Sequence, residues 1–233
     1  DNISLTTQAF IDGVYCDAAD GSRLETSNPA TGEIIASFSH CKAADVDRAV
    51  AAGRRVFNEG TWSRSAPEYR KEILLKLATL IEQNKEELAV LESMDAGKTI
   101  NDCLHEVGTE APAFFRWYAE LADKTFGKIA PTGPDAMALI VKEPAGVAGA
   151  ILPWNFPFLM AVWKIAPALA AGCSIVVKPA EQTPLSTIRL GALLNEAGVP
   201  AGVVSILPGL GETAGQAIGR HDDIDTVSFT GST

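Results

Sequence analysis

The second half of the chain alternates short apolar segments with amphipathic helical patterns. The apolar segments cover residues 147–152, 174–178, 203–207 and 226–229. Between them, residues 159–171, 185–197 and 213–220 carry apolar side chains at helical spacing. Strands that are apolar along their whole length are typical of a parallel sheet covered on both faces. The alternation therefore predicts an α/β fold, with an open parallel sheet built from right-handed βαβ units.

The first half of the chain follows another pattern. Residues 10–11 and 34–38 read as short strands, and 137–141 is a further strand-like segment. Three helical patterns lie between these strands. They cover residues 43–57, 67–96 and 99–123, with a bend expected at Pro112. We therefore expect a region of strands and helices ahead of the βαβ core.

Charge and composition exclude several classes of protein. With 19 basic and 29 acidic residues the net charge is −10, so no nucleic-acid partner is expected. Gly, Pro, Asn or Lys interrupts each apolar stretch before the roughly 20 residues that a membrane-spanning helix needs, so no membrane partner is expected either. The four cysteines lack the spacing of a disulfide framework or a zinc site. We expect no metal centre of that kind and a reducing, cytoplasmic location.

The loop after the first apolar segment carries a candidate catalytic side chain. It reads Pro153-Trp154-Asn155-Phe156-Pro157, and its two prolines restrict the backbone around Asn155. An amide held rigidly at the end of a strand can donate a hydrogen bond to an oxygen that becomes negative. A turn-forming Asn is the alternative interpretation.

The loop after the second apolar segment pairs a lysine with an acid. Glu181 stands just beyond the strand end, where a mononucleotide-binding unit holds a ribose diol, and Lys178 precedes it by three residues. A solvated Lys–Glu pair at the start of a helix is the alternative, and such a pair contributes only about 0–1 kcal/mol.

The last two loops are rich in glycine. Gly209, Gly211 and Gly215 follow the third apolar segment and permit close backbone approach. Gly231 and Ser232 follow the fourth, in the manner of a phosphate-binding helix start. Since the carboxyl ends of parallel strands share one edge, the four loops together favour a nucleotide-binding crevice.

One phosphate-loop signal is rejected. Gly97-Lys98-Thr99 matches the end of a P-loop, but Glu92 stands where the first glycine of that motif belongs. A helical pattern also precedes the motif, where a P-loop requires a strand.

Several long motifs resemble the NAD-binding half of the aldehyde dehydrogenase superfamily. The matching motifs are residues 28–32, 153–157, 167–172, 178–184 and 229–233. The resemblance covers essentially the whole chain and implies a Rossmann-like NAD-binding domain. It implies that 1–125 is the N-terminal part of this domain, 126–144 forms strands of an oligomerisation arm, and 145–233 is an incomplete NAD-binding core. It further implies a homo-oligomer, dimer or tetramer, in the whole protein.

The resemblance also implies a reaction and a role for each site residue. In the family, an aldehyde is oxidised to a carboxylate with NAD(P)⁺, and by similarity Asn155 helps to form the oxyanion hole. Lys178 and Glu181 would hold the adenosine ribose, and the acid favours NAD⁺ over NADP⁺. The other implied positions are Leu152, Pro153 and Trp154 in the cofactor cleft; Gly211 and Gly215 beside the adenine; Gly231 and Ser232 at the pyrophosphate; Phe156, Met160 and Trp163 in the aldehyde tunnel; and Asp95 and Gln182 near a monovalent cation.

The chain departs from the family pattern in one respect. In the family, the nucleophilic cysteine and the general-base glutamate follow the Phe-Thr-Gly-Ser motif, so here they would lie beyond Thr233. The resemblance therefore implies a truncated chain without a catalytic domain, inactive alone. Residues 51–98 look most like dehydrogenases of ω-amino or γ-glutamylated aldehydes from polyamine breakdown. The alternatives are a nucleotide-binding module without redox chemistry and an inactive fragment.

Overall fold

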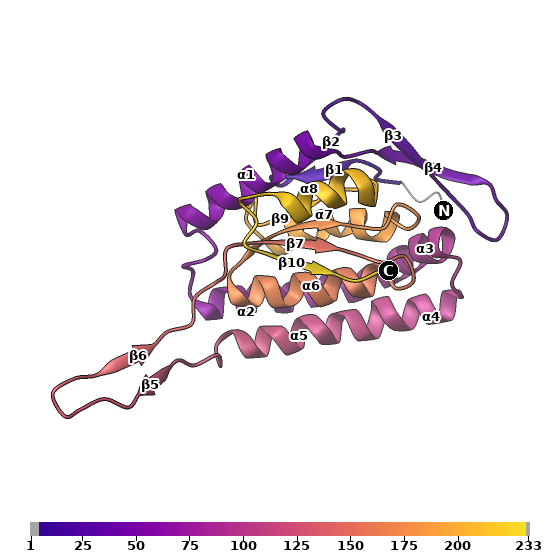
Figure 1. The fold of residues 1–233 in the computed structure, drawn as a ribbon. Helices are drawn as coiled ribbons and strands as arrows, with labels where there is room; N and C mark the ends of the chain where they lie inside the picture. The colour runs from indigo at the N-terminus through magenta and orange to yellow at the C-terminus, as the bar shows by residue number, and fades with distance from the viewer. Residues whose placement is uncertain (1–4, 232–233) are drawn as a thin grey trace.

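A six-stranded sheet runs through the centre of the molecule (Figure 1). The computed structural model describes residues 5–231. The strands are, in spatial order, β10 (Thr226–Phe229), β7 (Val147–Ile151), β8 (Ser174–Lys178), β9 (Val204–Ile206), β1 (Ala9–Ile11) and β2 (Val14–Cys16). The first four of these are parallel, which confirms the predicted α/β fold with βαβ units.

The sheet is not parallel throughout, and here the prediction of an open parallel sheet was incomplete. Strand β1 pairs antiparallel with β9 through Phe10 and Ile206, and β2 pairs antiparallel with β1. Asp12 and Gly13 join β1 to β2, and both have positive φ angles, of 52° and 78°. A two-residue turn of that kind matches the twist of a hairpin, so it places these strands side by side in opposite directions.

Helices cover both faces of the sheet (Figure 1). On one face lie α1 (Ala43–Glu59) and α8 (Gln216–Arg220), which follows the π-helical turn η2 (Gly211–Gly215). On the other face lie α6 (Pro157–Ala171) and α7 (Leu185–Ala197). The larger hydrophobic core fills the space between this second pair and the sheet.

The helix predicted over 67–96 is two helices. The chain forms α2 (Pro67–Gln83) and α3 (Lys85–Ala96), and Asn84 separates them. Asn84 leaves helical geometry, and its side-chain Nδ2 donates to the carbonyl of Leu80 at 2.8 Å. Asparagine competes in this way for backbone groups, and it therefore ends helices that apolar periodicity alone would continue.

The helix predicted over 99–123 is interrupted as well. It consists of α4 (Ile100–His105), the π-helical turn η1 (Glu106–Glu110) and α5 (Ala111–Ala122). The irregular turn ends two residues before Pro112, where the bend was expected. A proline has no N–H and its ring displaces the carbonyl four residues earlier, so the wider turn relieves the clash.

Two hairpins complete the fold. One joins β3 (Arg23–Ser27) to β4 (Ile34–Ser39), and the other joins β5 (Lys128–Ala130) to β6 (Ala138–Ile140). Figure 1 shows the β5–β6 hairpin projecting away from the body of the molecule. Its apolar side chains are exposed, among them Ile129 and Leu139. Within residues 5–231, no helix combines the length and the apolar character needed to cross a bilayer.

Candidate functional site

The carboxyl ends of the parallel strands lie at one edge of the sheet, in register. Phe229 of β10 pairs with Ile151 of β7, and Ile151 pairs with Lys178 of β8. The amide of Leu152 donates to the carbonyl of Lys178 at 3.0 Å, and the amide of Thr230 donates to Ile151 at 3.1 Å. The loops predicted to form a crevice therefore leave the sheet side by side.

The lysine and the acid at the end of β8 form an ion pair. The ammonium of Lys178, only 2% exposed, donates to Oε2 of Glu181 at 2.8 Å and to the carbonyl of Gly209 at 2.9 Å. Partial burial is the largest single influence on Glu181 and opposes its ionisation. The hydrogen bond and the charge of Lys178, together with the Glu181 backbone amide and Gln182, nevertheless hold the pKa of that carboxyl below its ordinary value. Because the lysine is buried and also held by the next loop, a freely solvated pair does not describe this geometry.

The glycines of the last two loops differ in their surroundings. A side chain on Gly211 would meet open space, and a Cβ on Gly215 would make only ordinary contacts, with the Lys178 stem at 3.7 Å, Ile151 at 3.8 Å and the Leu210 carbonyl at 3.9 Å. Gly209 is confined, because a Cβ there would come within 2.5 Å of the carbonyl oxygen of Cys41. A Cβ on Gly231 would lie 2.7 Å from the ring of Phe229. Ser232, assigned with Gly231 to the pyrophosphate, lies outside the described residues.

The loop after β7 presents its polar and aromatic side chains to the surface. Asn155 is exposed and Trp154 is 59% exposed. Leu152 is buried within the main hydrophobic core, and Pro153 is half-buried. Within residues 5–231, the Asn155 side chain makes no hydrogen bond, which leaves its amide available to a ligand.

The predicted tunnel residues lie at the start of α6 and on its first turns. Phe156 precedes the helix, and Met160 and Trp163 lie on it three residues apart, so these two side chains share one face. Trp163 packs against Phe114 of α5, with ring centroids 4.8 Å apart. Phe114 extends this row of side chains, and it was not predicted as a site residue because no sequence motif marks its position on α5.

Asp95 and Gln182, the predicted cation neighbours, line the same cavity of about 310 Å³ together with Glu181. The Oδ2 atom of Asp95 accepts a hydrogen bond at 3.0 Å from the amide of Leu185, the first residue of α7. Its other oxygen is buried without a partner among the described residues. Within that part of the chain no cluster of three metal-ligating side chains occurs.

A second buried acid lies one helical turn earlier on α3 and was not predicted as a site residue. Glu92 is fully buried, and its Oε2 accepts a hydrogen bond at 3.0 Å from the amide of Phe158 in the first turn of α6. Burial raises the pKa of Glu92 to about 7, although the Phe158 amide and the Lys98 ammonium oppose the shift. Its proximity to α6 depends on tertiary packing, so no local pattern could have revealed it.

The fold and the crevice edge define a Rossmann-like α/β domain. The chain belongs to the aldehyde dehydrogenase family, whose sequence pattern matches residues 15–233. The family assignment predicted from the motifs is thereby confirmed.

Individual relatives are similar over nearly the whole chain. Aminoacetaldehyde dehydrogenase of Pseudomonas aeruginosa is 51% identical over 99% of this chain and 47% of its own length. The NADP/NAD-dependent aldehyde dehydrogenase PuuC of Escherichia coli is 48% identical over 100% of this chain and 47% of its own length. Among solved structures, an indole-3-acetaldehyde dehydrogenase complexed with NAD⁺ superposes with a TM-score of 0.97 at 46% identity, over 99% of this chain and 47% of that one. The chain thus spans about half the length of the relatives it matches.

Proposed function

We propose that this chain forms the NAD-binding part of an enzyme that oxidises an aldehyde to a carboxylic acid. The observation that carries the proposal is the juxtaposition, at one edge of the sheet, of an exposed amide on Asn155 and the Lys178–Glu181 pair. The family membership and an NAD⁺-bound structural relative support it.

The crevice fits a dinucleotide on its own chemistry. Glu181 is ionised and only partly exposed, so it can accept hydrogen bonds from a ribose diol, while Lys178 holds it in place. The space over Gly211 admits a flat group against the backbone. A 2′-phosphate would meet the Glu181 carboxylate, and the repulsion favours NAD⁺ over NADP⁺.

In this proposal, bound NAD⁺ supplies the oxidant that accepts hydride from the substrate carbon. The role of this chain is to bind, orient and stabilise. Asn155 donates its amide N–H to the aldehyde oxygen as negative charge develops there, a contribution of about 3–4 kcal/mol for such a donor. Phe156, Met160 and Trp163 would contact the substrate on its way to Asn155. Asp95 and Gln182 would lie near a bound monovalent cation.

For the substrate we propose an amino- or γ-glutamylamino-aldehyde. Support comes from the 51% identity to an aminoacetaldehyde dehydrogenase. The competing proposal is a module that binds the nucleotide without redox chemistry, or an inactive fragment.

One experiment separates these possibilities. The whole protein is incubated with NAD⁺ and a panel of ω-amino, γ-glutamylamino, betaine and aliphatic aldehydes, and NADH is followed by absorbance. We expect NADH formation with the highest kcat/KM for the amino-aldehydes. Equal kcat/KM across the panel would contradict the substrate class. NAD⁺ binding without NADH formation would favour the non-catalytic alternative.

The β5–β6 hairpin supports a further part of the proposal, a homo-oligomer. Its strands pair only with each other among the described residues, and its apolar side chains are exposed. Exposed strand edges of this kind are stabilised by pairing with another chain or segment.

A further inference from the structure

Two buried acids and a partly buried lysine form a cluster behind the Asn155 loop. Glu92 lies on α3, Lys98 follows the end of that helix, and Glu106 begins η1. The Lys98 ammonium forms an ion pair with Glu106 and lies 3.9 Å from Oε1 of Glu92. Burying such charges is costly unless they are paired and hydrogen-bonded, so this cluster requires an explanation beyond stability.

The cluster contacts the chain immediately after Asn155. Oε2 of Glu92 accepts the hydrogen bond from the Phe158 amide, and the ammonium of Lys98 lies 4.1 Å from the ring centroid of Phe156. The first contact satisfies a free N–H at the start of α6. The second is a cation–π interaction, which strengthens when the partners are shielded from water. Both contacts fall within three residues of Asn155.

Few other hydrogen bonds hold the loop. Pro153 and Pro157 have no N–H, and within residues 5–231 no hydrogen bond involves Trp154 or Asn155. At the start of the loop, the amide of Leu152 donates a hydrogen bond to the carbonyl of Lys178 in β8. On the far side the Phe156 carbonyl accepts, among the described residues, only from the amide of Met160, in the first turn of α6 itself. Glu92 and Lys98 therefore provide the polar contacts that connect this side of the loop to another part of the fold, next to the apolar packing of Phe158 in the core.

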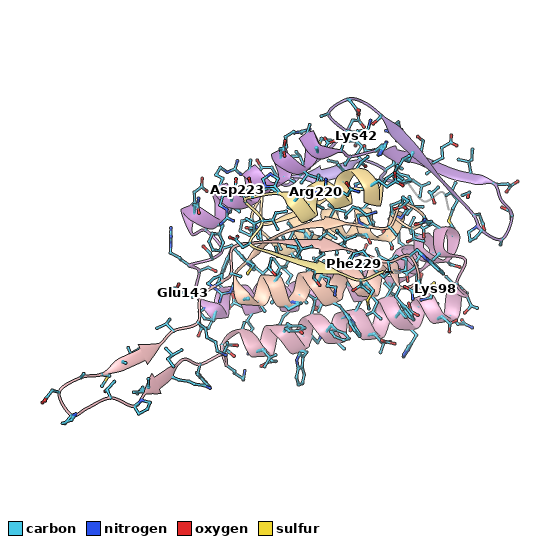
Figure 2. All side chains as sticks on the ribbon, in the orientation of Figure 1. Lys42, Lys98, Glu143, Arg220, Asp223 and Phe229 are labelled. Carbon is cyan, nitrogen blue, oxygen red and sulfur yellow. The ribbon has the colours of Figure 1, made fainter. Side chains whose placement is uncertain are left out.

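Gly97 brings Lys98 into this position. It has a φ angle of 70°, and a Cβ there would lie 2.5 Å from Cγ of Pro29. The left-handed residue ends α3 and turns the chain back, so Lys98 returns alongside Glu92. Figure 2 shows Lys98 and Phe229 toward the same end of the sheet, where β7 and β10 terminate. The motif Gly97-Lys98-Thr99, which is not a P-loop, thus places Lys98 beside Glu92.

We propose that Glu92 and Lys98 are positioning residues, which hold the Asn155 loop from behind and set where its amide points. The inference rests on the proposed function, in which that amide meets the aldehyde oxygen. A displacement of about 1 Å in such a group lowers the rate by about 100-fold, so loss of either anchor reduces turnover without removing any group that contacts substrate.

The test compares variants of the whole protein. We expect Glu92→Ala and Lys98→Met to lower kcat about 10- to 100-fold while the KM for NAD⁺ changes less than about twofold. Lys98→Arg keeps a cation over the Phe156 ring and restores most of kcat. Glu92→Gln retains an acceptor for the Phe158 amide and falls between wild type and Glu92→Ala.

Glu87→Ala is the matched control for stability. Glu87 also lies on α3 and ties it to another helix, through a 2.9 Å ion pair with Arg189 of α7. Among the described residues, no hydrogen bond or ion pair joins Glu87 to the Asn155 loop. We expect a lower melting temperature with unchanged kcat. An equal loss of kcat in Glu87→Ala would overturn the proposal, because general destabilisation would then account for the effect.

Hydrogen–deuterium exchange gives a readout that needs no activity. In Glu92→Ala, the peptide covering 152–160 exchanges at least about tenfold faster, while β9 is unchanged. Unchanged exchange of that peptide in both Glu92→Ala and Lys98→Met would overturn the inference. If the wild-type protein oxidises no aldehyde, the proposed function fails, and the exchange result still decides whether these residues hold the loop.

Discussion

Lys178 and Glu181 form a contact of 2.8 Å in which the cation is buried and the anion is partly open to the crevice. The Lys178 ammonium donates to the carbonyl of Gly209 as well as to Glu181, so the buried cation is fixed and the Glu181 carboxylate lies on its crevice side. A carboxylate fixed in this way can bind hydroxyl groups without first losing side-chain freedom.

Replacing Glu181 by Gln tests cofactor recognition. A hydrogen bond to a charged group contributes about 1.5–3 kcal/mol, so the Kd for NAD⁺ should rise by at least about tenfold. The preference over NADP⁺ should shrink, since the repulsion of a 2′-phosphate is lost. Titration calorimetry of the whole protein measures both. Glu59→Gln, an exposed carboxylate on α1, is the control, and an equal effect in that variant would contradict the assignment.

Replacing Asn155 by Ala tests the proposed oxyanion donor. Removing one such donor costs about 100- to 1,000-fold in kcat, while NAD⁺ affinity should stay the same because the amide meets the substrate. Steady-state kinetics and cofactor titration separate the two quantities. Asn101→Ala, an exposed Asn on α4, should behave as wild type. Turnover within about threefold of wild type in Asn155→Ala would refute the role.

Glu92 predicts a pH dependence of stability. Its pKa rises from 4.5 to about 7 on folding, so between these values the folded state binds more protons than the unfolded state. Stability from this group is therefore highest at low pH and falls as pH rises through that window, by up to about 3 kcal/mol. Glu92→Gln removes the titration but leaves Lys98, Glu106 and Asp95 in place.

The measurement is urea unfolding of both proteins between pH 4.5 and 8. We expect Glu92→Gln to gain stability relative to wild type as the pH rises. Unfolding free energies that keep a constant difference across this range would show that Glu92 does not titrate as its burial indicates.

Gly97 should be more sensitive to substitution than a second glycine of the same backbone geometry. In Gly97→Ala, the alanine must adopt a left-handed φ, which lowers the free energy of unfolding by about 1–2 kcal/mol. Its Cβ also clashes with Pro29, which lowers it by a further ~1–3 kcal/mol. Gly32 has a φ of 77° but open space around it, so Gly32→Ala bears only the first cost. Thermal unfolding compares them. Equal losses would mean that the Pro29 contact relaxes freely.

The β5–β6 hairpin predicts an effect on assembly. Leu139→Lys places a charge on its exposed apolar surface and should lower the oligomeric mass of the whole protein in light scattering. Val14→Lys is the control, because Val14 is also exposed on the edge strand β2. A mass unchanged by Leu139→Lys would argue against assembly through the hairpin.

Much of the fold followed from local patterns. Apolar segments of strand length between helical stripes were enough to predict β7, β8 and β9, because a strand covered on both faces must be apolar throughout. The edge strand β10 followed from the same alternation of segments, although most of its residues are exposed. The limits of the helices did not follow from the apolar pattern alone. The interruption at Asn84 depends on a side chain that competes for backbone carbonyls, and apolar periodicity does not record that competition.

The sequence by itself determined the family, the parallel strands and the candidate residues at their ends, since motif residues adjoin the strands in the chain. Only the tertiary structure decided that Lys178 is buried against Gly209, that β1 joins the sheet antiparallel, and that Glu92 and Lys98 lie behind Asn155. These relationships join residues that are tens of positions apart. They are stabilised by burial and by pairing between separate elements of the fold. A short stretch of sequence does not show which elements will pack together.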